Sequence, residues 1–172
     1  TMQMAEGLDT GDMLLTYETK VGEKETAGEL FDRLAQSGAE LLIQTLVKLD
    51  EITPRPQDDA QSCYAHMLDK QMAVIDWSKS AHEIDCLIRG LNPWPSAYTS
   101  YAGKTMKIWA ADVADLPGER TPGKIHVTKN QLFVETGDGV LDVKELQLEG
   151  KKRMDTASFL RGFQMEDGSF CG

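Results

Sequence analysis

The sequence predicts a two-part fold: a short strand–strand–helix segment of α/β type, a linker, and a small, mainly β, partly open barrel of the OB type with one attached helix. Apolar residues recur at the helical period of 3.6 before residue 50 and again over residues 80–90, and the period becomes 2 after residue 96. Residues 53–73 contain two prolines and few apolar side chains, which is typical of a linker. The expected division is therefore 1–52, 53–73 and 74–172.

The first part is expected to contain two strands and one long helix. Residues 1–4 and 13–21 are predicted strands, separated by the glycine-bounded loop 7–12. Thr26 and Glu29 have the spacing of a capping box, which predicts that the helix begins there, and leucines continue its apolar stripe as far as residue 49.

The second part begins with a helix and continues with strands. Ser80 and Glu83 form a second capping box at the start of a helix over 80–90, and Pro93 and Pro95 prevent its continuation. A hairpin turn is expected at residues 137–139 and a last short helix at 154–162. Five short strands are predicted between the first helix and the last, at residues 97–101, 105–113, 124–128, 131–136 and 140–148.

The composition is that of a globular protein and excludes several classes. With 28 acidic and 18 basic residues the chain has a net charge of −10, so as a whole it repels polyanions and is no simple nucleic-acid coat. Residues 61–172 carry a net charge of only −2 and could present a basic face. The sequence contains no apolar run long enough for a membrane span and does not open on a signal peptide, so no membrane partner is expected. With its cysteines expected to be reduced, the protein is expected to be cytoplasmic, and it is expected to be a monomer.

The cysteines and histidines do not suggest a metal site. Cys63, Cys86 and Cys171 are odd in number and lack C-x-x-C spacing, so reduced thiols are expected and a zinc site is not. The three histidines have no ligand-like spacing and are interpreted as structural.

Asp9 is the main candidate for catalysis. It stands between Gly7 and Gly11, where glycines allow positive φ and a close approach of the backbone to a ligand. A carboxylate held in such a loop could take or position a proton. The alternative is a turn aspartate that hydrogen-bonds its own backbone.

A basic cluster and three tryptophans are candidates for contacts with nucleic acid. Residues 151–153 are Lys-Lys-Arg, and Lys104 and Lys107 are expected on one face of a predicted strand. These bases could bind phosphates, or they could be a solvated edge that protects an exposed strand. Trp77, Trp94 and Trp109 could stack on bases but are assigned to the core, with Trp94 between two prolines as a plug where helix meets barrel.

Several segments resemble the methionyl-tRNA formyltransferase family in order along nearly the whole chain. Glycine-rich and Lys-Lys segments favour this family over sibling folate-dependent formyltransferases. The segments are Met-Gln-Met at 2–4, Gly-Leu-Asp-Thr-Gly-Asp-Met at 7–13, Ile-Asp-Trp at 75–77, Ile-Arg-Gly-Leu-Asn-Pro-Trp-Pro at 88–95, Thr-Gly-Asp-Gly-Val-Leu at 136–141, Leu-Gln at 146–147 and Gly-Lys-Lys at 150–152.

The resemblance implies transfer of a formyl group from 10-formyltetrahydrofolate to the amino group of methionyl-initiator tRNA. It implies that 1–52 end a Rossmann-like catalytic domain and that 74–172 are an OB-like domain that helps to hold the tRNA. Of the family's catalytic Asn, His and Asp, only the Asp has a counterpart here, Asp9; the other two and the folate loop are expected in a segment before Thr1. The chain alone is therefore expected to be inactive and to bind tRNA weakly. Candidate contacts to tRNA are Lys70, Lys104, Lys107, Lys151, Lys152 and Arg153.

Two alternatives stay open at this stage. One is a sibling enzyme that uses the same folate donor to formylate an amino sugar on a nucleotide. The other is a non-enzymatic binding module of the OB type, whose N-terminal residues serve only in packing.

Overall fold

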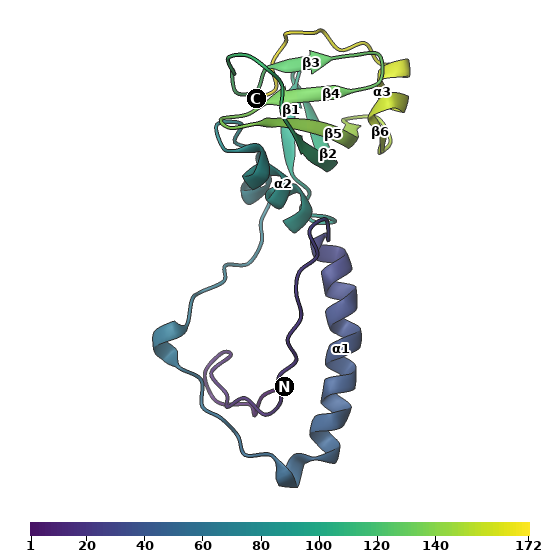
Figure 1. Cartoon of the computed structure of the whole chain (residues 1–172). Coiled ribbons are helices and arrows are strands. Elements are labelled where there is room, and N and C mark those ends of the chain that lie inside the picture. Colours follow the sequence, from purple (N-terminus) through teal and green to yellow (C-terminus); the bar gives the residue numbers. More distant parts are fainter. The chain divides into compact units, whose positions relative to one another are not determined.

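A computed structural model describes all residues, 1–172, as two compact units, Thr1–Met67 and Leu68–Gly172. Figure 1 labels their helices and strands. The boundary between the units falls inside the segment 53–73 that the sequence predicts to be a linker.

The first unit contains one long helix, α1 (Ala27–Val47), as its periodicity predicts. Its capping box is present: the backbone N–H of Glu29 donates to the Thr26 hydroxyl at 3.3 Å, and the N–H of Thr26 donates to a carboxylate oxygen of Glu29 at 2.9 Å. Two single-turn 3₁₀ helices follow, η1 (Leu49–Glu51) and η2 (Asp59–Gln61). Within α1 only Thr45 is buried, and Phe31 is 72% exposed.

The two strands predicted in the first unit are wrong. Residues 1–4 and 13–21 form only isolated bridges, Met2 with Met13 and Met13 with Arg55. The Met13–Arg55 bridge has both of its hydrogen bonds, at 2.8 and 2.9 Å. A strand requires a neighbour along its length, but Thr1 pairs only with Leu14 and Leu15, and this unit contains no strand beside residues 16–21.

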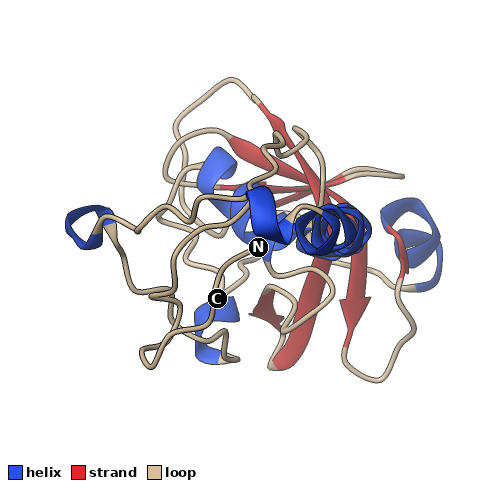
Figure 2. Ribbon diagram, turned by 90° about the horizontal axis from the view of Figure 1, so that it is seen from below, coloured by secondary structure: helices blue, strands red, loops and turns tan.

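The strands of the second unit are β1 (Tyr98–Tyr101), β2 (Lys104–Ala114), β3 (Ile125–Val127), β4 (Leu132–Glu135), β5 (Val140–Leu148) and β6 (Met154–Asp155). They form a six-stranded antiparallel sheet with the strand order β1-β2-β5-β4-β3, in which β6 pairs with β5. The sheet curls into a half-barrel, and the helices α2 (Ala81–Gly90) and α3 (Thr156–Gly162) pack against it (Figures 1 and 2). The five predicted strands are confirmed within two residues at each end, whereas β6 was not predicted.

The core of the second unit lies between α2, α3 and one face of the sheet. Ile84 and Ile88 come from α2, Met106 and Ile108 alternate inward along β2, and Phe159 comes from α3; each is 2% exposed or less. A register shift between Ile108 and Ala110 interrupts the pairing of β2 with β5. Such a shift bends a strand, which accounts for the curl of the sheet at this place.

The predicted turn at residues 137–139 is confirmed and joins β4 to β5. The backbone N–H of Gly137 donates to the carbonyl oxygens of Trp77 and Lys79, at 2.9 Å each, and the N–H of Ala81 donates to Asp138 O at 2.7 Å. A Cβ on Gly137 would lie 1.9 Å from Ser78 O. Glycine is required here because the turn presses its backbone against the segment that leads into α2.

Irregular segments pair with both outer strands of the sheet. On β1, Ile75 N–H donates to Tyr98 O at 2.8 Å. On β3, Ile125 exchanges hydrogen bonds with the C-terminal segment 168–172, donating to Ser169 O at 2.8 Å and accepting from Gly168 N at 2.9 Å. The same C-terminal segment reaches β1, where Gly172 N–H donates to Ser100 O at 3.2 Å.

The core assignment of the tryptophans is right for one residue and wrong for another. Trp77 is buried, and its indole N–H donates to the Thr99 hydroxyl at 3.1 Å. Trp94 is 56% exposed, because the proline-flanked turn after α2 directs it outward rather than between helix and barrel. Trp109 is half-buried on β2.

Candidate functional site

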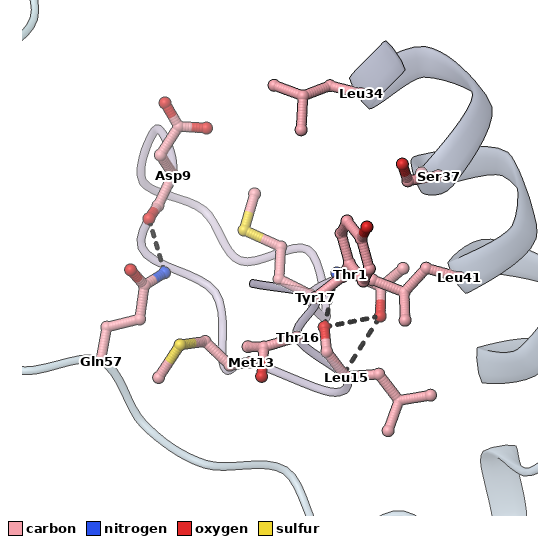
Figure 3. Close-up of a pocket in the computed structure, with 12 residues that line it drawn as sticks. Thr1, Asp9, Met13, Leu15, Thr16, Tyr17, Leu34, Ser37, Leu41 and Gln57 are labelled. Atoms are coloured by element: carbon pink, nitrogen blue, oxygen red, sulfur yellow. Dashed lines mark hydrogen bonds between the residues drawn. The ribbon is translucent and has the colours of Figure 1, made fainter. Parts of the chain in front are cut away.

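Asp9 lies at the tip of a loop that three backbone contacts hold closed. The side-chain amide of Gln57 donates to Asp9 O at 2.7 Å (Figure 3) and to Gly11 O at 2.7 Å, and Gln3 N–H donates to Asp12 O at 2.9 Å. A Cβ on Gly11 would lie 1.7 Å from Gln3 O, so that glycine is required for a close backbone approach. The expectation that the glycines supply positive φ is wrong, because Asp9 itself takes that conformation, with φ of 55°.

The carboxylate of Asp9 is open to solvent and accepts no hydrogen bond from the chain. Figure 3 shows it pointing away from Gln57, whereas its backbone carbonyl points toward that residue. The hydrogen bond inside this turn is made by Thr10, whose hydroxyl donates to Gly7 O at 3.1 Å. The loop therefore leaves the carboxylate of Asp9 available to a ligand or to another side chain.

A pocket of about 460 Å³ adjoins the loop inside the first unit. Asp9 stands at its edge, and Leu34, Ser37 and Leu41 of α1 form one of its walls (Figure 3). Thr1 is fixed beside it by a 2.8 Å hydrogen bond between the hydroxyls of Thr1 and Thr45. Asp9 has the only charged side chain of the lining, which otherwise consists of methionines, leucines, hydroxyl-bearing residues, one glycine and one amide.

The structure brings most of the predicted basic candidates to one end of the second unit's sheet. Lys107 pairs with Gln147 in the β2–β5 ladder, and Tyr101 pairs with Lys104 in the β1–β2 hairpin. The turn at 149–153 follows β5 directly, and Lys151 N–H donates to Leu148 O at 2.9 Å. Lys70 is exposed at the start of the 3₁₀ turn η3 (Gln71–Ala73), outside this ladder.

The expected shared face for Lys104 and Lys107 is wrong. The two residues are three positions apart, and an odd separation in a strand places side chains on opposite faces. Lys107 lies on the face of Trp109, whereas Lys104 lies on the side of the buried Met106, at the exposed start of β2. Exposure at the strand end, rather than a common face, leaves Lys104 accessible.

The basic candidates differ in whether an acidic side chain pairs with them. Lys107, Lys151 and Lys152 form no ion pair, whereas Arg153 donates to the carboxylate of Glu145 and Glu145 raises the pKa of its guanidinium. The ammonium of Lys107 and the guanidinium of Arg153 both lie over the ring of Trp109, at 5.6 and 4.4 Å from its centre. Lys151 lies over Phe163 at 5.4 Å.

Sequence reasoning missed a buried acidic group in the second unit. Glu135 is 6% exposed and accepts hydrogen bonds from Thr121 N–H and from the ring of His126. Burial raises the pKa of this carboxyl, but the Thr121 N–H and His126 lower it more, so the net shift is downward. The signal was the hairpin itself, because in the β3–β4 register Glu135 stands diagonal to His126 on one face.

The cysteines and the remaining histidines do not build a catalytic group. Cys171 is buried, which raises the pKa of its thiol to about 12. Cys86 is exposed on α2 with its sulfur 3.7 Å from Nε2 of His82. Across the 172 described residues no three of the His, Cys, Asp and Glu side chains are grouped as metal ligands. None of the helices has the length and apolar character needed to cross a membrane.

Residues 67–164 match the family model for the C-terminal domain of formyl transferases, and since this is more than half of the chain, the chain belongs to that family. Relatives named methionyl-tRNA formyltransferase are about half identical to it along almost its whole length. The one from Agathobacter rectalis is 49% identical over 173 residues, covering 99% of this chain and 56% of the relative, and the one from Lachnospira eligens is 53% identical over 180 residues, covering 100% and 57%. The chain thus spans little more than half the length of these curated relatives.

Solved structures share the fold at low sequence identity. HypX from Aquifex aeolicus in complex with tetrahydrofolic acid has a TM-score of 0.62 at 16% identity, covering 99% of this chain and 33% of that one. A sugar 3N-formyl transferase, WlaRD, has a TM-score of 0.64 at 17% identity, covering 88% and 54%. Identities this low support the architecture alone.

Proposed function

We propose that residues 1–172 are part of a methionyl-tRNA formyltransferase, which transfers a formyl group from 10-formyltetrahydrofolate to the amino group of methionyl-initiator tRNA. The observation that carries the proposal is the identity of about one half with methionyl-tRNA formyltransferases over 99–100% of this chain. In this proposal, residues 1–52 belong to the Rossmann-like formyl-transfer domain, 53–73 are a linker, and 74–172 are an OB-like domain that assists tRNA binding in a cytoplasmic, monomeric enzyme.

Asp9 is the residue of this chain that we assign to the chemistry. The amine must be neutral to attack the formyl carbon, and the carbonyl oxygen becomes negative as the tetrahedral intermediate forms. The carboxylate of Asp9, fixed at a loop tip and without a partner in the chain, is placed to accept the amine's proton or to orient a histidine that does. No residue of this chain is assigned to the folate co-substrate.

The chain by itself is expected to lack activity. The resemblance requires an Asn and a His two residues apart as further catalytic groups, and neither Asn92 nor Asn130 has a histidine at that spacing. Without donors for the developing oxyanion, the barrier would rise by about 3 kcal/mol or more for each donor lost.

The tRNA is proposed to contact Lys70, Lys104, Lys107, Lys151, Lys152 and Arg153. Support comes from the clustering of five of these residues at one end of the sheet and from the absence of ion pairs on Lys107, Lys151 and Lys152. Because residues 61–172 carry a net charge of −2, binding should be weak and strongly salt-dependent.

A chimera tests the catalytic proposal. In the Agathobacter rectalis enzyme, the segment that matches this chain is replaced by residues 1–172, and formylation of methionyl-tRNA is measured beside an amino-sugar nucleotide as competing acceptor. The chimera should formylate the tRNA, Asp9→Asn should reduce kcat at least 100-fold, and Asp12→Asn on the same loop should change it little. A chimera that formylates the sugar instead, or an Asp9→Asn chimera with full activity, would contradict the proposal.

A further inference from the structure

We propose that Trp109, which the sequence pattern assigns to the core, positions Lys107 and Arg153 as a paired site for the phosphates of RNA. This inference rests on the proposed function, because it takes tRNA as the occupant of the surface. It adds Trp109 to the basic candidates and gives this residue a defined role, because its ring contacts two cations from distant segments of the chain.

The geometry links residues that are far apart in sequence. Lys107 precedes Trp109 by two positions on β2, so both side chains lie on the same face of the strand. Arg153 comes from the turn between β5 and β6, and its guanidinium lies 4.4 Å from the centre of the Trp109 ring. With the Lys107 ammonium at 5.6 Å, the two charges share one aromatic ring although 46 positions separate them.

An aromatic ring reduces the cost of holding two like charges close together. The negative face of an indole attracts each cation by about 0.5–1 kcal/mol at exposed sites, which offsets part of their mutual repulsion. The guanidinium of Arg153 also donates a hydrogen bond from one of its terminal nitrogens to the carboxylate of Glu145. Both side chains are thus ordered before a ligand arrives, and less conformational entropy is lost on binding.

The two cations keep groups that can reach a phosphate. A guanidinium has five N–H donors, and the side chain of Arg153 is 44% exposed, so donors remain beside the one that Glu145 uses. Lys107 forms no ion pair. By contrast, Lys144 on β5 is held by Asp142 at 2.5 Å and by Asp112 at 3.6 Å, and its charge is already neutralised.

Phosphate, rather than a stacked base, fits this arrangement. The Trp109 ring is half-buried and already in contact with two cations, so it offers no open platform for a base. Lys151 and Lys152, without ion pairs, extend the positive charge along the neighbouring turn. An RNA backbone supplies successive phosphates, which several neighbouring cations can contact together.

The test measures the salt dependence of tRNA binding to the full 172-residue chain. Fluorescently labelled initiator tRNA is titrated at several salt concentrations, and the slope of log K against log[salt] is compared between variants. Each phosphate contact contributes about 0.7–0.9 to this slope. Trp109→Leu should flatten the slope by about 1–2, Trp109→Phe should keep most of it because a ring remains, and Trp94→Leu, an exposed tryptophan of the same unit with no cation over its ring, should leave it unchanged.

A spectroscopic measurement covers the case in which Trp109→Leu does not fold. In a Trp94→Phe background, only Trp77 and Trp109 emit, and Trp77 is buried. Adding tRNA should shift the emission, because phosphates that bind the two cations change the electrostatic field at the indole of Trp109, and salt should reverse the shift. No shift at saturating tRNA, or an unchanged salt slope in folded Trp109→Leu, would overturn the inference while leaving the formylation result of the chimera untouched. Absence of any tRNA binding would overturn both this inference and the proposed tRNA contacts.

Discussion

Replacing Gly137 with alanine tests the packing of the β4–β5 turn against the segment before α2. The added Cβ would lie 1.9 Å from Ser78 O and 2.7 Å from the Ser78 carbonyl carbon, both backbone atoms, so the turn and the segment must separate. Separation breaks three hydrogen bonds, from Gly137 N–H to Trp77 O and Lys79 O and from Ala81 N–H to Asp138 O. At about 0.5–1.5 kcal/mol each, the expected loss in the free energy of unfolding is about 3 kcal/mol.

Urea denaturation followed by tryptophan fluorescence measures this loss in the right unit, because Trp77, Trp94 and Trp109 all belong to Leu68–Gly172. In a unit of this size the melting temperature should also fall by about 12 °C or more. Gly90→Ala is the matched control: its Cβ would meet nothing within 4 Å, and at the end of α2 it should be neutral or stabilising by up to about 1 kcal/mol. If the free energy of unfolding of Gly137→Ala is within about 0.5 kcal/mol of that of the parent chain, the close approach of the turn does not stabilise the fold and the reasoning is wrong.

Three further outcomes are expected. Burial raises the pKa of the Cys171 thiol to about 12, so iodoacetamide at pH 8 should label Cys63 and Cys86 in the folded chain and Cys171 only after denaturation. Mass spectrometry of the peptides measures the labelling, and labelling of Cys171 in the folded chain would contradict its burial. The pKa of Glu135 is lowered in the fold, so its carboxylate stabilises the folded state above pH 4.5, and this contribution is lost as the pH falls through the lower folded pKa. The loss in the free energy of unfolding caused by Glu135→Gln should therefore be largest near pH 7 and should shrink below pH 4.5. The control Glu119→Gln, at an exposed site, should show no such pH dependence. Ser80→Ala removes the capping box of α2 and should lower the free energy of unfolding by about 1 kcal/mol in the same urea assay, while Ser62→Ala in the first unit should not affect the tryptophan transition.

The sequence predicted the elements whose signals are local. The capping boxes of Thr26 and Ser80 mark the starts of α1 and α2, because both partners lie within four residues of one another. Alternation located β1 to β5 for a similar reason, since one face of each strand is buried in the same core. Residues 14–21 contain β-forming side chains but no partner strand within the unit, and propensity alone does not make a ladder.

The candidate site was predictable as a set of residues but not as an arrangement. The sequence singled out Asp9 from its glycine-bounded loop, but not that Asp9 itself takes the positive φ or that Gln57 closes the loop from 48 positions away. It found the Lys-Lys-Arg run but not the stacking of Arg153 on Trp109, which depends on where the turn between β5 and β6 places the arginine relative to β2. Contacts of this kind arise from tertiary packing and leave no local pattern.

The pairing of the C-terminal segment has a consequence for how the second unit behaves among copies of itself. Exposed strand edges recruit edges from other molecules, and residues 168–172 occupy hydrogen-bonding positions on both outer strands, at Ile125 of β3 and Ser100 of β1. These five residues thus connect the two outer strands of the sheet through backbone hydrogen bonds. Removing residues 168–172 would uncover the hydrogen-bonding groups of Ile125 and Ser100 and would also take the buried Cys171 out of the core, so a chain trimmed at residue 167 would be prone to intermolecular β-pairing.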